Sequence, residues 1–280
     1  MSWLPSLLWG PYAQPFMLQA LAVGLLVATL CGLLSCFVVL KGWSLMGDAV
    51  SHAILPGVVG AYLIGIPLVL GAFAAGMACA LMAGAVPATS RVKEDAALGV
   101  VFSGMLALGL VMLTQVRSNV HLSHVLFGSI LGIEEEDLWQ TLAVAGIGLA
   151  ILAIKGRDLV LFLFDPGQAR IIGASPTTLR IILLALLAAA IVAGVQAVGV
   201  ILVVALLITP GAIGILMADR FGRMCAVAVG AAWIAVIIGL HVSYVADISP
   251  AGCIVLVLSA LFALALAVSP KHGLLRARPA

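Results

Sequence analysis

The sequence predicts an all-α, polytopic integral membrane protein with eight or nine transmembrane helices. Of its 280 residues, 64% are hydrophobic and only 9% are charged, against roughly a quarter charged in an ordinary soluble domain. Apolar stretches of about 20 residues, the length that crosses a bilayer, follow one another from Phe16 to Val268. The formal net charge of +2 is too small, and its carriers are too scattered, for a nucleic-acid surface.

Long apolar runs in lipid must be helices, because every backbone donor and acceptor has to be satisfied within the segment. Residues 1–15 contain no Lys or Arg, so the basic region of a signal peptide is missing and the first stretch is expected to remain as a mature span. One membrane domain covering residues 1–280 is predicted, with nine spans, or eight if one does not cross. The predicted spans are 16–40, 46–64, 66–86, 96–116, 138–154, 178–196, 199–218, 224–245 and 249–268.

Basic residues gather in four places, which the positive-inside rule assigns to the cytoplasm. Two predicted spans separate each successive pair of these groups, so the assignments agree with one another. The C-terminus is then cytoplasmic and the N-terminus lies outside, with Arg117 as the single basic residue on the outer side. The four groups are Arg91 with Lys93, the stretch 155–180, Arg220 with Arg223, and the tail residues Lys271, Arg276 and Arg278.

The five cysteines all lie inside apolar stretches and form no CxxC or Cys/His cluster. We therefore expect them to be small core residues rather than redox or zinc-site residues. They are Cys31, Cys36, Cys79, Cys225 and Cys253.

Most predicted spans contain no ionisable residue, and the second is the exception, with Asp48 and His52 in its apolar sequence. Such residues at membrane depth are costly and indicate function by default. A spacing of four places both on one helix face, and a carboxylate with an imidazole suits Mn²⁺, Fe²⁺ and Zn²⁺ better than Ca²⁺ or Mg²⁺. Gly47 and the pair Pro56–Gly57 are expected to break the helix beside them.

A structural role is the alternative for this pair: Asp48 would accept a hydrogen bond from His52 and fix two helices. Two ligands also do not complete a shell of four to six, so other groups would have to join them. A second copy of the same helix would supply two more, which makes dimerisation chemically reasonable.

Other ionisable residues lie on the predicted outer side. His121 and His124, with the acidic run Glu134–Asp137, would form either a metal-collecting vestibule or a solvated rim, and we favour the rim. His241 and Asp247 are further metal candidates near the outer end of the last hairpin, where a helix cap or an interface hydrogen bond explains them equally well.

Residues 158–180 form the most distinctive cytoplasmic segment, with apolar and charged residues punctuated by Pro166, Gly167, Gly173 and Pro176. This pattern predicts a short helix between two turns at the membrane surface. It is either an ordinary amphipathic loop or a docking surface for a cytoplasmic partner.

Enzymatic functions find no support in the sequence. No lysine belongs to a GK[ST] phosphate-binding motif, so the chain cannot itself be an ATPase. His52 lacks the HExxH spacing of a zinc protease, and no GxSxG nucleophile pattern occurs near the spans.

Five segments closely resemble the manganese/zinc/iron chelate ABC permease family, and their order and spacing cover almost the whole chain. The sequence motif VHLxHxLFG resembles the manganese/iron branch of the family more than the zinc branch. The segments are MGDAVSHAILPGVV (46–59), HLSHVLFGSILG (121–132), DPGQARIIG (165–173), ILVVALLITPGAIGILMADR (201–220) and SYVADISPAGCIVL (243–256).

This resemblance implies a type II ABC importer permease in the bacterial inner membrane that imports Mn²⁺ or Fe²⁺, with Zn²⁺ as a further candidate. It implies a homodimer, two cytoplasmic ATP-binding subunits that use the ATP, an extracytoplasmic metal-binding protein, and no permanently bound cofactor. Asp48 and His52 are implied to handle the ion during alternating access.

The resemblance also implies a coupling helix at the start of the segment 165–176, matching Asp165, Ala169, Arg170 and Gly173. The alternative function is an ion-coupled secondary metal transporter with Asp48 as its protonation site. It would need neither partner subunits nor a docking helix.

Overall fold

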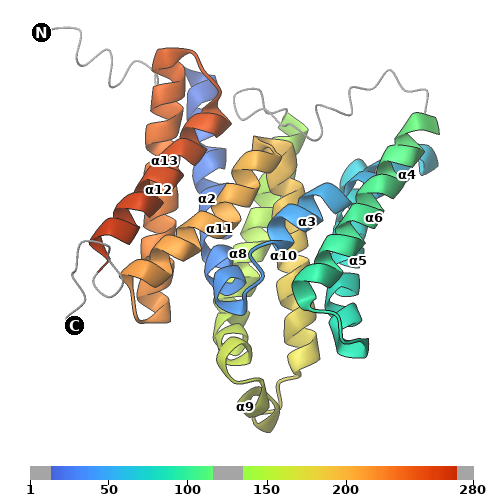
Figure 1. The fold of residues 1–280 in the computed structure, drawn as a ribbon. Coiled ribbons are helices and arrows are strands. Elements are labelled where there is room, and N and C mark those ends of the chain that lie inside the picture. Colours follow the sequence, from blue (N-terminus) through green and yellow to red (C-terminus); the bar gives the residue numbers. More distant parts are fainter. Residues whose placement is uncertain (1–13, 116–134, 270–280) are drawn as a thin grey trace, which may run out of the picture.

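The computed structural model describes residues 14–115 and 135–269, and its regular secondary structure there is entirely helical (Figure 1). The helices are α2 (Pro15–Lys41), α3 (Met46–Ala53), α4 (Leu55–Ile64), α5 (Leu68–Thr89), α6 (Glu94–Gln115), α8 (Glu135–Phe164), α9 (Pro166–Ile171), α10 (Pro176–Val198), α11 (Val200–Met217), α12 (Phe221–Ala246) and α13 (Pro250–Val268).

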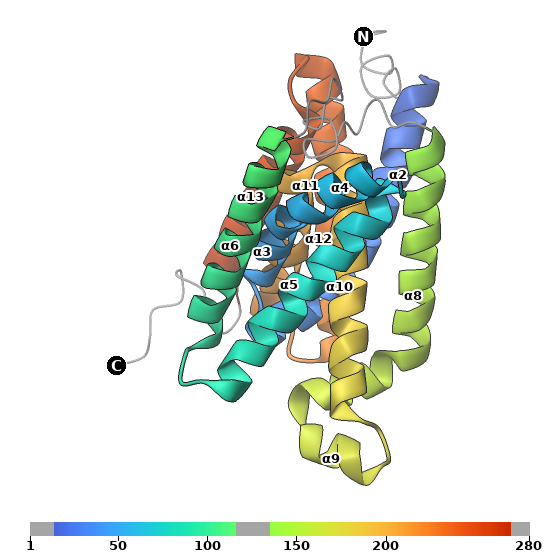
Figure 2. The ribbon, with the colours of Figure 1, turned by 90° about the vertical axis from the view of Figure 1, so that its right-hand side faces the viewer.

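Eight spans in the described ranges are long and apolar enough to cross a membrane: α2, α3–α4 taken together, α5, α6 and α10 to α13. The helix α8 is not in this set, although it is 30 residues long and contains the predicted span 138–154. Figure 2 shows α8 running along the height of the bundle beside α10, against which it packs. The predicted all-α class with eight or nine spans is thus confirmed.

Several basic segments share one end of the bundle. In Figure 1 the short helix α9 and the connections α5–α6 and α11–α12 all lie at the lower end, which we call the α9 end. The connection α5–α6 carries Arg91 and Lys93, and Arg220 precedes α12. This arrangement agrees with the prediction that the basic groups lie on one side of the membrane; the basic tail residues lie outside the described ranges.

Three helices begin with the same two-residue signal, a capping Ser or Asp followed by Pro. The capping oxygen accepts a hydrogen bond from the backbone N–H three residues further on. Proline suits the first helical position, where its missing N–H is not needed. The pairs are Asp165–Pro166 for α9, Ser175–Pro176 for α10 and Ser249–Pro250 for α13.

The second span is kinked at Ile54, between α3 and α4. The cause is Pro56, which has no N–H to donate to the preceding turn of the helix. The expected break near Pro56–Gly57 is therefore present. Gly47, which can also break a helix, does not do so: it lies within α3, where it packs beside Leu207 of α11.

Gly57 has a packing role that the sequence did not indicate. A Cβ atom built on Gly57 would lie 2.0 Å from the carbonyl oxygen of Gly71, and one built on Gly71 would lie 2.2 Å from the carbonyl oxygen of Gly57. The helices α4 and α5 therefore touch backbone to backbone. Such close approach through small residues is how helices associate in membranes.

The centre of the bundle is formed by α2, which packs against α8, α11 and α12. Leu34 of α2, Leu187 of α10 and Leu207 of α11 are completely or almost completely buried there. Four of the five cysteines are buried, Cys225 is half-buried, and all five thiols are free. This agrees with the expectation that they pack as small core residues.

The segment 158–180 differs from its prediction in one respect. Residues 158–164 continue α8 instead of joining the short helix, and only Pro166–Ile171 form that helix, α9. An extended α8 satisfies its backbone hydrogen bonds internally up to Phe164, and the chain turns only at the cap and proline, Asp165–Pro166.

Candidate functional site

Asp48 and His52 lie one turn apart on the same face of α3, as their spacing predicted. Asp48 Oδ1 is 3.5 Å from His52 Nε2, and the two side chains are 49% and 43% exposed, respectively. Figure 1 shows α3 between the two ends of the bundle. The pair therefore lies on a helix between the two ends of the bundle, and each side chain keeps nearly half of its surface exposed.

The two side chains line one cavity of about 700 Å³. Its other walls come from the junction between α10 and α11 and from the start of α13. The lining includes Val198, Gly199 and Ser249. Residues from three distant parts of the sequence thus surround the side on which Asp48 and His52 are open.

Gly199 shapes the cavity wall through its backbone conformation, with φ 90° and ψ 159°. This region is essentially restricted to glycine. It separates α10 from α11 and leaves main-chain groups next to the cavity without a side chain in front of them. Interrupted spans that expose backbone to a cavity are a common way to build ion sites in transporters.

The geometry argues against a purely structural role for the pair. Both residues belong to α3, so their contact cannot fix two helices to each other. A separation of 3.5 Å also exceeds the usual 2.7–3.2 Å of a hydrogen bond to oxygen (about 3 Å on average). Instead, the His52 ring lies 6.4 Å from the ring of Phe102 on α6, measured between centroids.

Two side chains do not fill the coordination shell of a transition metal. Within the described ranges, no three His, Cys, Asp or Glu side chains come together in a way that could hold a metal ion. An ion held by Asp48 and His52 would therefore need further ligands, which the described His, Cys, Asp and Glu side chains do not supply.

Most of the other candidate residues on the predicted outer side are not described by the structure. His121, His124 and Glu134 lie outside the described residues, and the only side chain of the acidic run that is described, Glu135, is exposed at the start of α8. These candidates stay predictions.

His241 is half-buried on α12, and Asp247 is exposed and caps the end of that helix in the left-handed conformation. Neither residue lines the cavity around Asp48. The helix cap, one of the two explanations that the sequence offered for Asp247, is what the structure shows.

The segment around α9 combines a fixed base with an exposed outer surface. Asp165 caps the helix by accepting a hydrogen bond from the Gln168 N–H at 2.9 Å, and Ala169 is completely buried. Arg170 is exposed, and Ile171 is 85% exposed. Gly173 closes the helix with φ 84°. A large apolar side chain exposed in this way suits a surface that another protein covers.

The described chain is thus a bundle with eight helical spans apolar enough to cross a membrane, with an acid–histidine pair on α3 and a short helix, α9, at one end. The ABC 3 transport family matches residues 13–269, and the chain belongs to this family. It is therefore a permease subunit, as its resemblance predicted.

Known relatives match over nearly the full chain. The manganese transport system membrane protein MntB of Synechocystis sp. is 44% identical over 265 residues, which cover 95% of this chain and 87% of MntB. A probable iron transport system membrane protein of Haemophilus influenzae is 48% identical over 259 residues, or 92% and 96% of the two chains.

A solved structure, PsaBC from Streptococcus pneumoniae in complex with Fab, has the same fold. The TM-score is 0.84 at 32% sequence identity, and the match covers 96% of this chain and 97% of that one.

Proposed function

We propose that the chain is the permease subunit of an ATP-driven importer of divalent transition-metal ions, with Mn²⁺ and Fe²⁺ favoured and Zn²⁺ as a further candidate. The observation that carries the proposal is the placement of Asp48 and His52 together on the wall of one cavity inside the bundle. Relatives named for manganese and iron transport support the choice of ions.

The chemistry of the pair fits this cargo. A carboxylate oxygen and an imidazole nitrogen together suit Mn²⁺, Fe²⁺ and Zn²⁺, whereas Ca²⁺ and Mg²⁺ favour oxygen ligands alone. Both side chains keep nearly half of their surface accessible, so an ion in the cavity can reach them. Because Asp48 and His52 would supply only part of the coordination shell, the ion can also be released. A complete, buried shell would hinder that release.

A second copy of the chain would complete the site in a homodimer. Two copies with their α3 helices facing each other would offer two carboxylates and two imidazoles, enough for a four-coordinate shell. The cavity volume of about 700 Å³, with small groups such as Gly199 and Ser249 in the wall, leaves room for such ligands.

Transport then follows by alternating access. Two cytoplasmic subunits would bind and hydrolyse ATP, and their closure would rock the two permease copies so that the cavity opens first outward and then inward. An extracytoplasmic protein would deliver the ion. Membership of the ABC 3 transport family favours this importer over the secondary transporter, which would operate without partner subunits.

We assign the docking of the ATP-binding subunits to α9, because its base is fixed by Asp165 and Ala169 while Arg170 and Ile171 face outward. Reversing the charge at Arg170 with Arg170→Glu should uncouple ATP hydrolysis from uptake or remove the partner during purification, since an exposed cation would become an anion in the contact. Co-purification and ATPase activity of the purified complex measure this.

The matched control is Arg91→Glu, which makes the same charge change on an exposed residue at the α9 end but outside α9. Normal coupling and co-purification in Arg170→Glu would remove α9 from the docking surface.

The cargo is tested by competition. In cells that express the whole system, uptake of radioactive Mn²⁺ should fall when Fe²⁺ is added and should not respond to Ca²⁺ or Mg²⁺ at similar concentrations. Competition by Ca²⁺ or Mg²⁺ as strong as that by Fe²⁺ would contradict a site built on a carboxylate and an imidazole.

A further inference from the structure

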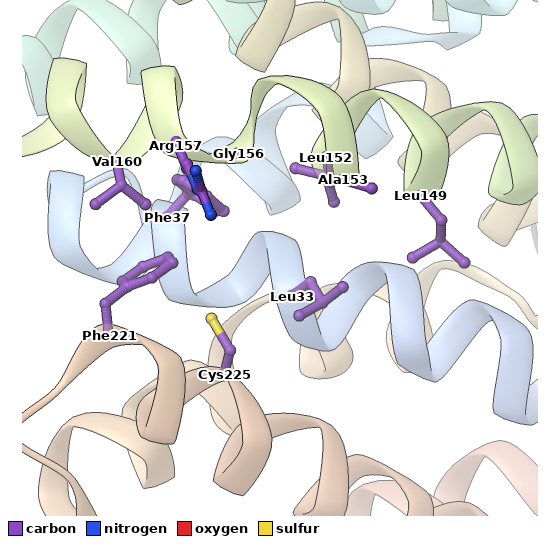
Figure 3. A pocket seen from close by; sticks show the side chains of 10 residues that line it. All are labelled: Leu33, Phe37, Leu149, Leu152, Ala153, Gly156, Arg157, Val160, Phe221 and Cys225. Atoms are coloured by element: carbon purple, nitrogen blue, oxygen red, sulfur yellow. The ribbon is translucent and has the colours of Figure 1, made fainter.

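A second cleft, unconnected with Asp48 and His52, lies between α8 and α12 with α2 as its floor (Figure 3). Its volume is about 520 Å³, within the roughly 300–1,000 Å³ of small-molecule sites. Leu149 and Leu33 lie toward one end of it, and Phe37 and Phe221 lie at the other. Two of these helices, α2 and α12, are long and apolar enough to cross a membrane.

The lining is apolar except at two positions, Arg157 on α8 and Cys225 on α12. Figure 3 shows the Arg157 side chain descending from α8 toward Phe37, at the same end of the cleft as Phe221. A permanent cation thus stands at one end of an otherwise hydrophobic cleft. Hydrocarbon alone would not favour a guanidinium there.

The depth of Arg157 matches the membrane surface at the α9 end. Phe37 is one turn before the end of α2 at Lys41, and Phe221 is the first residue of α12. Arg157 is seven residues before the end of α8. The cation therefore lies near the level where the apolar stretches of α2 and α12 end, and in a bilayer the ends of such stretches meet the lipid headgroups.

Arg157 also has no acidic partner in the part of the chain that the structure describes. Its neighbour Lys155 pairs with Asp158 at 3.2 Å, so the carboxylate closest in sequence is already engaged by another cation. The exposed guanidinium can therefore donate hydrogen bonds to a ligand at this end of the cleft.

We propose that this cleft binds one anionic phospholipid, with an acyl chain along Leu33 and Leu149 and the phosphate on Arg157. A guanidinium binds phosphate oxygens through two parallel hydrogen bonds. Basic pockets between transmembrane helices are suited to anionic headgroups, and the apolar floor of α2 accommodates the chain. The lipid would fill the space between α8 and α12 and so brace α8, which leads directly into α9.

Another apolar cleft provides an internal comparison. It lies among α2, α5, α8 and α10, has a volume of about 330 Å³, and is lined without any charged residue. It can accept a hydrocarbon chain but has no means to select a headgroup. Of these two clefts, the Arg157 cleft should therefore be the one that selects anionic lipid.

The test is native mass spectrometry of the full-length permease, titrated with phosphatidylglycerol or with phosphatidylcholine of the same acyl chains. The wild type should bind one phosphatidylglycerol per chain about five-fold more tightly than phosphatidylcholine, the preference expected from one cation at the surface. Arg157→Gln should bind both lipids equally. Inorganic phosphate in excess should not displace the phosphatidylglycerol, since the chain supplies part of the binding.

Two further variants make the result specific. Gly156→Leu should abolish tight binding of either lipid in this cleft, because a Cβ at Gly156 meets no neighbour and the new side chain would fill the space without disturbing α8. Lys155→Gln, which removes a cation that does not line the cleft, should bind like the wild type. A retained preference in Arg157→Gln, or an equal loss in Lys155→Gln, would overturn the proposal.

A loss of the dimer in Gly156→Leu would also overturn it, because the cleft would then be a contact between two copies.

Discussion

Replacing Asp48 or His52 by alanine is expected to reduce metal accumulation to background while leaving the protein in the membrane. Each substitution removes one of the two ionisable side chains that line the cavity, and in a dimer it removes the same group twice. Neither change creates a buried vacancy in the core, because both side chains are nearly half exposed. Uptake of radioactive Mn²⁺, normalised to the amount of permease in the membrane, measures the effect.

The matched control is Asp95→Ala, which removes an exposed carboxylate at the start of α6 and should leave uptake unchanged. Wild-type uptake in both Asp48→Ala and His52→Ala would end the assignment of the ion to this pair. Loss of the protein from the membrane in the two variants, with normal Asp95→Ala, would instead indicate the structural role.

The largest effect on stability is expected at Gly57. In Gly57→Ala the new Cβ would lie 2.0 Å from the Gly71 carbonyl oxygen and 2.6 Å from the Ala75 side chain, so α4 and α5 must move apart. Overpacking of this kind costs about 1–3 kcal/mol, and contact with backbone places it at the upper end. The thermal midpoint in detergent should fall by several degrees, or the protein should fail to accumulate.

Gly60→Ala is the matched control on the same helix, one turn away. A Cβ at Gly60 meets only the Met112 methyl group at 3.9 Å, so the substitution should be neutral or raise stability by up to about 1 kcal/mol through helix propensity. A loss of stability in Gly57→Ala together with an unchanged or higher stability in Gly60→Ala would show that Gly57 allows the close packing of α4 on α5. Equal and small effects at both would contradict the backbone contact between α4 and α5.

The number and order of the spans were predictable because lipid allows few alternatives. An apolar run must be a helix, and charged groups mark where it stops. The kink was also predictable, since Pro56 removes a backbone donor wherever it stands in a helix.

The faces that pack inward were not predictable. A soluble helix reveals its buried face by an apolar stripe, but these spans are apolar all round. Leu256 and Leu258 of α13 illustrate the difficulty: Leu256 is 70% exposed and Leu258 is completely buried. The same limit hid the role of Gly57, since its partner Gly71 lies on another helix.

The site was predictable only in part. Asp48 and His52 could be recognised because ionisable residues are rare at membrane depth. The opposite wall of the cavity is made by Gly199 and Ser249, which depend on contacts between distant segments. For Gly199, the sequence indicated only that a glycine stands at the boundary between two apolar stretches.

ATP-driven import through Asp48 and His52 can be measured as accumulation of Mn²⁺ in liposomes that contain the purified permease with its ATP-binding partner. We predict accumulation that requires ATP and the partner subunit and that is lost in Asp48→Ala. Accumulation by the permease alone, driven by a proton or sodium gradient without ATP, would contradict it.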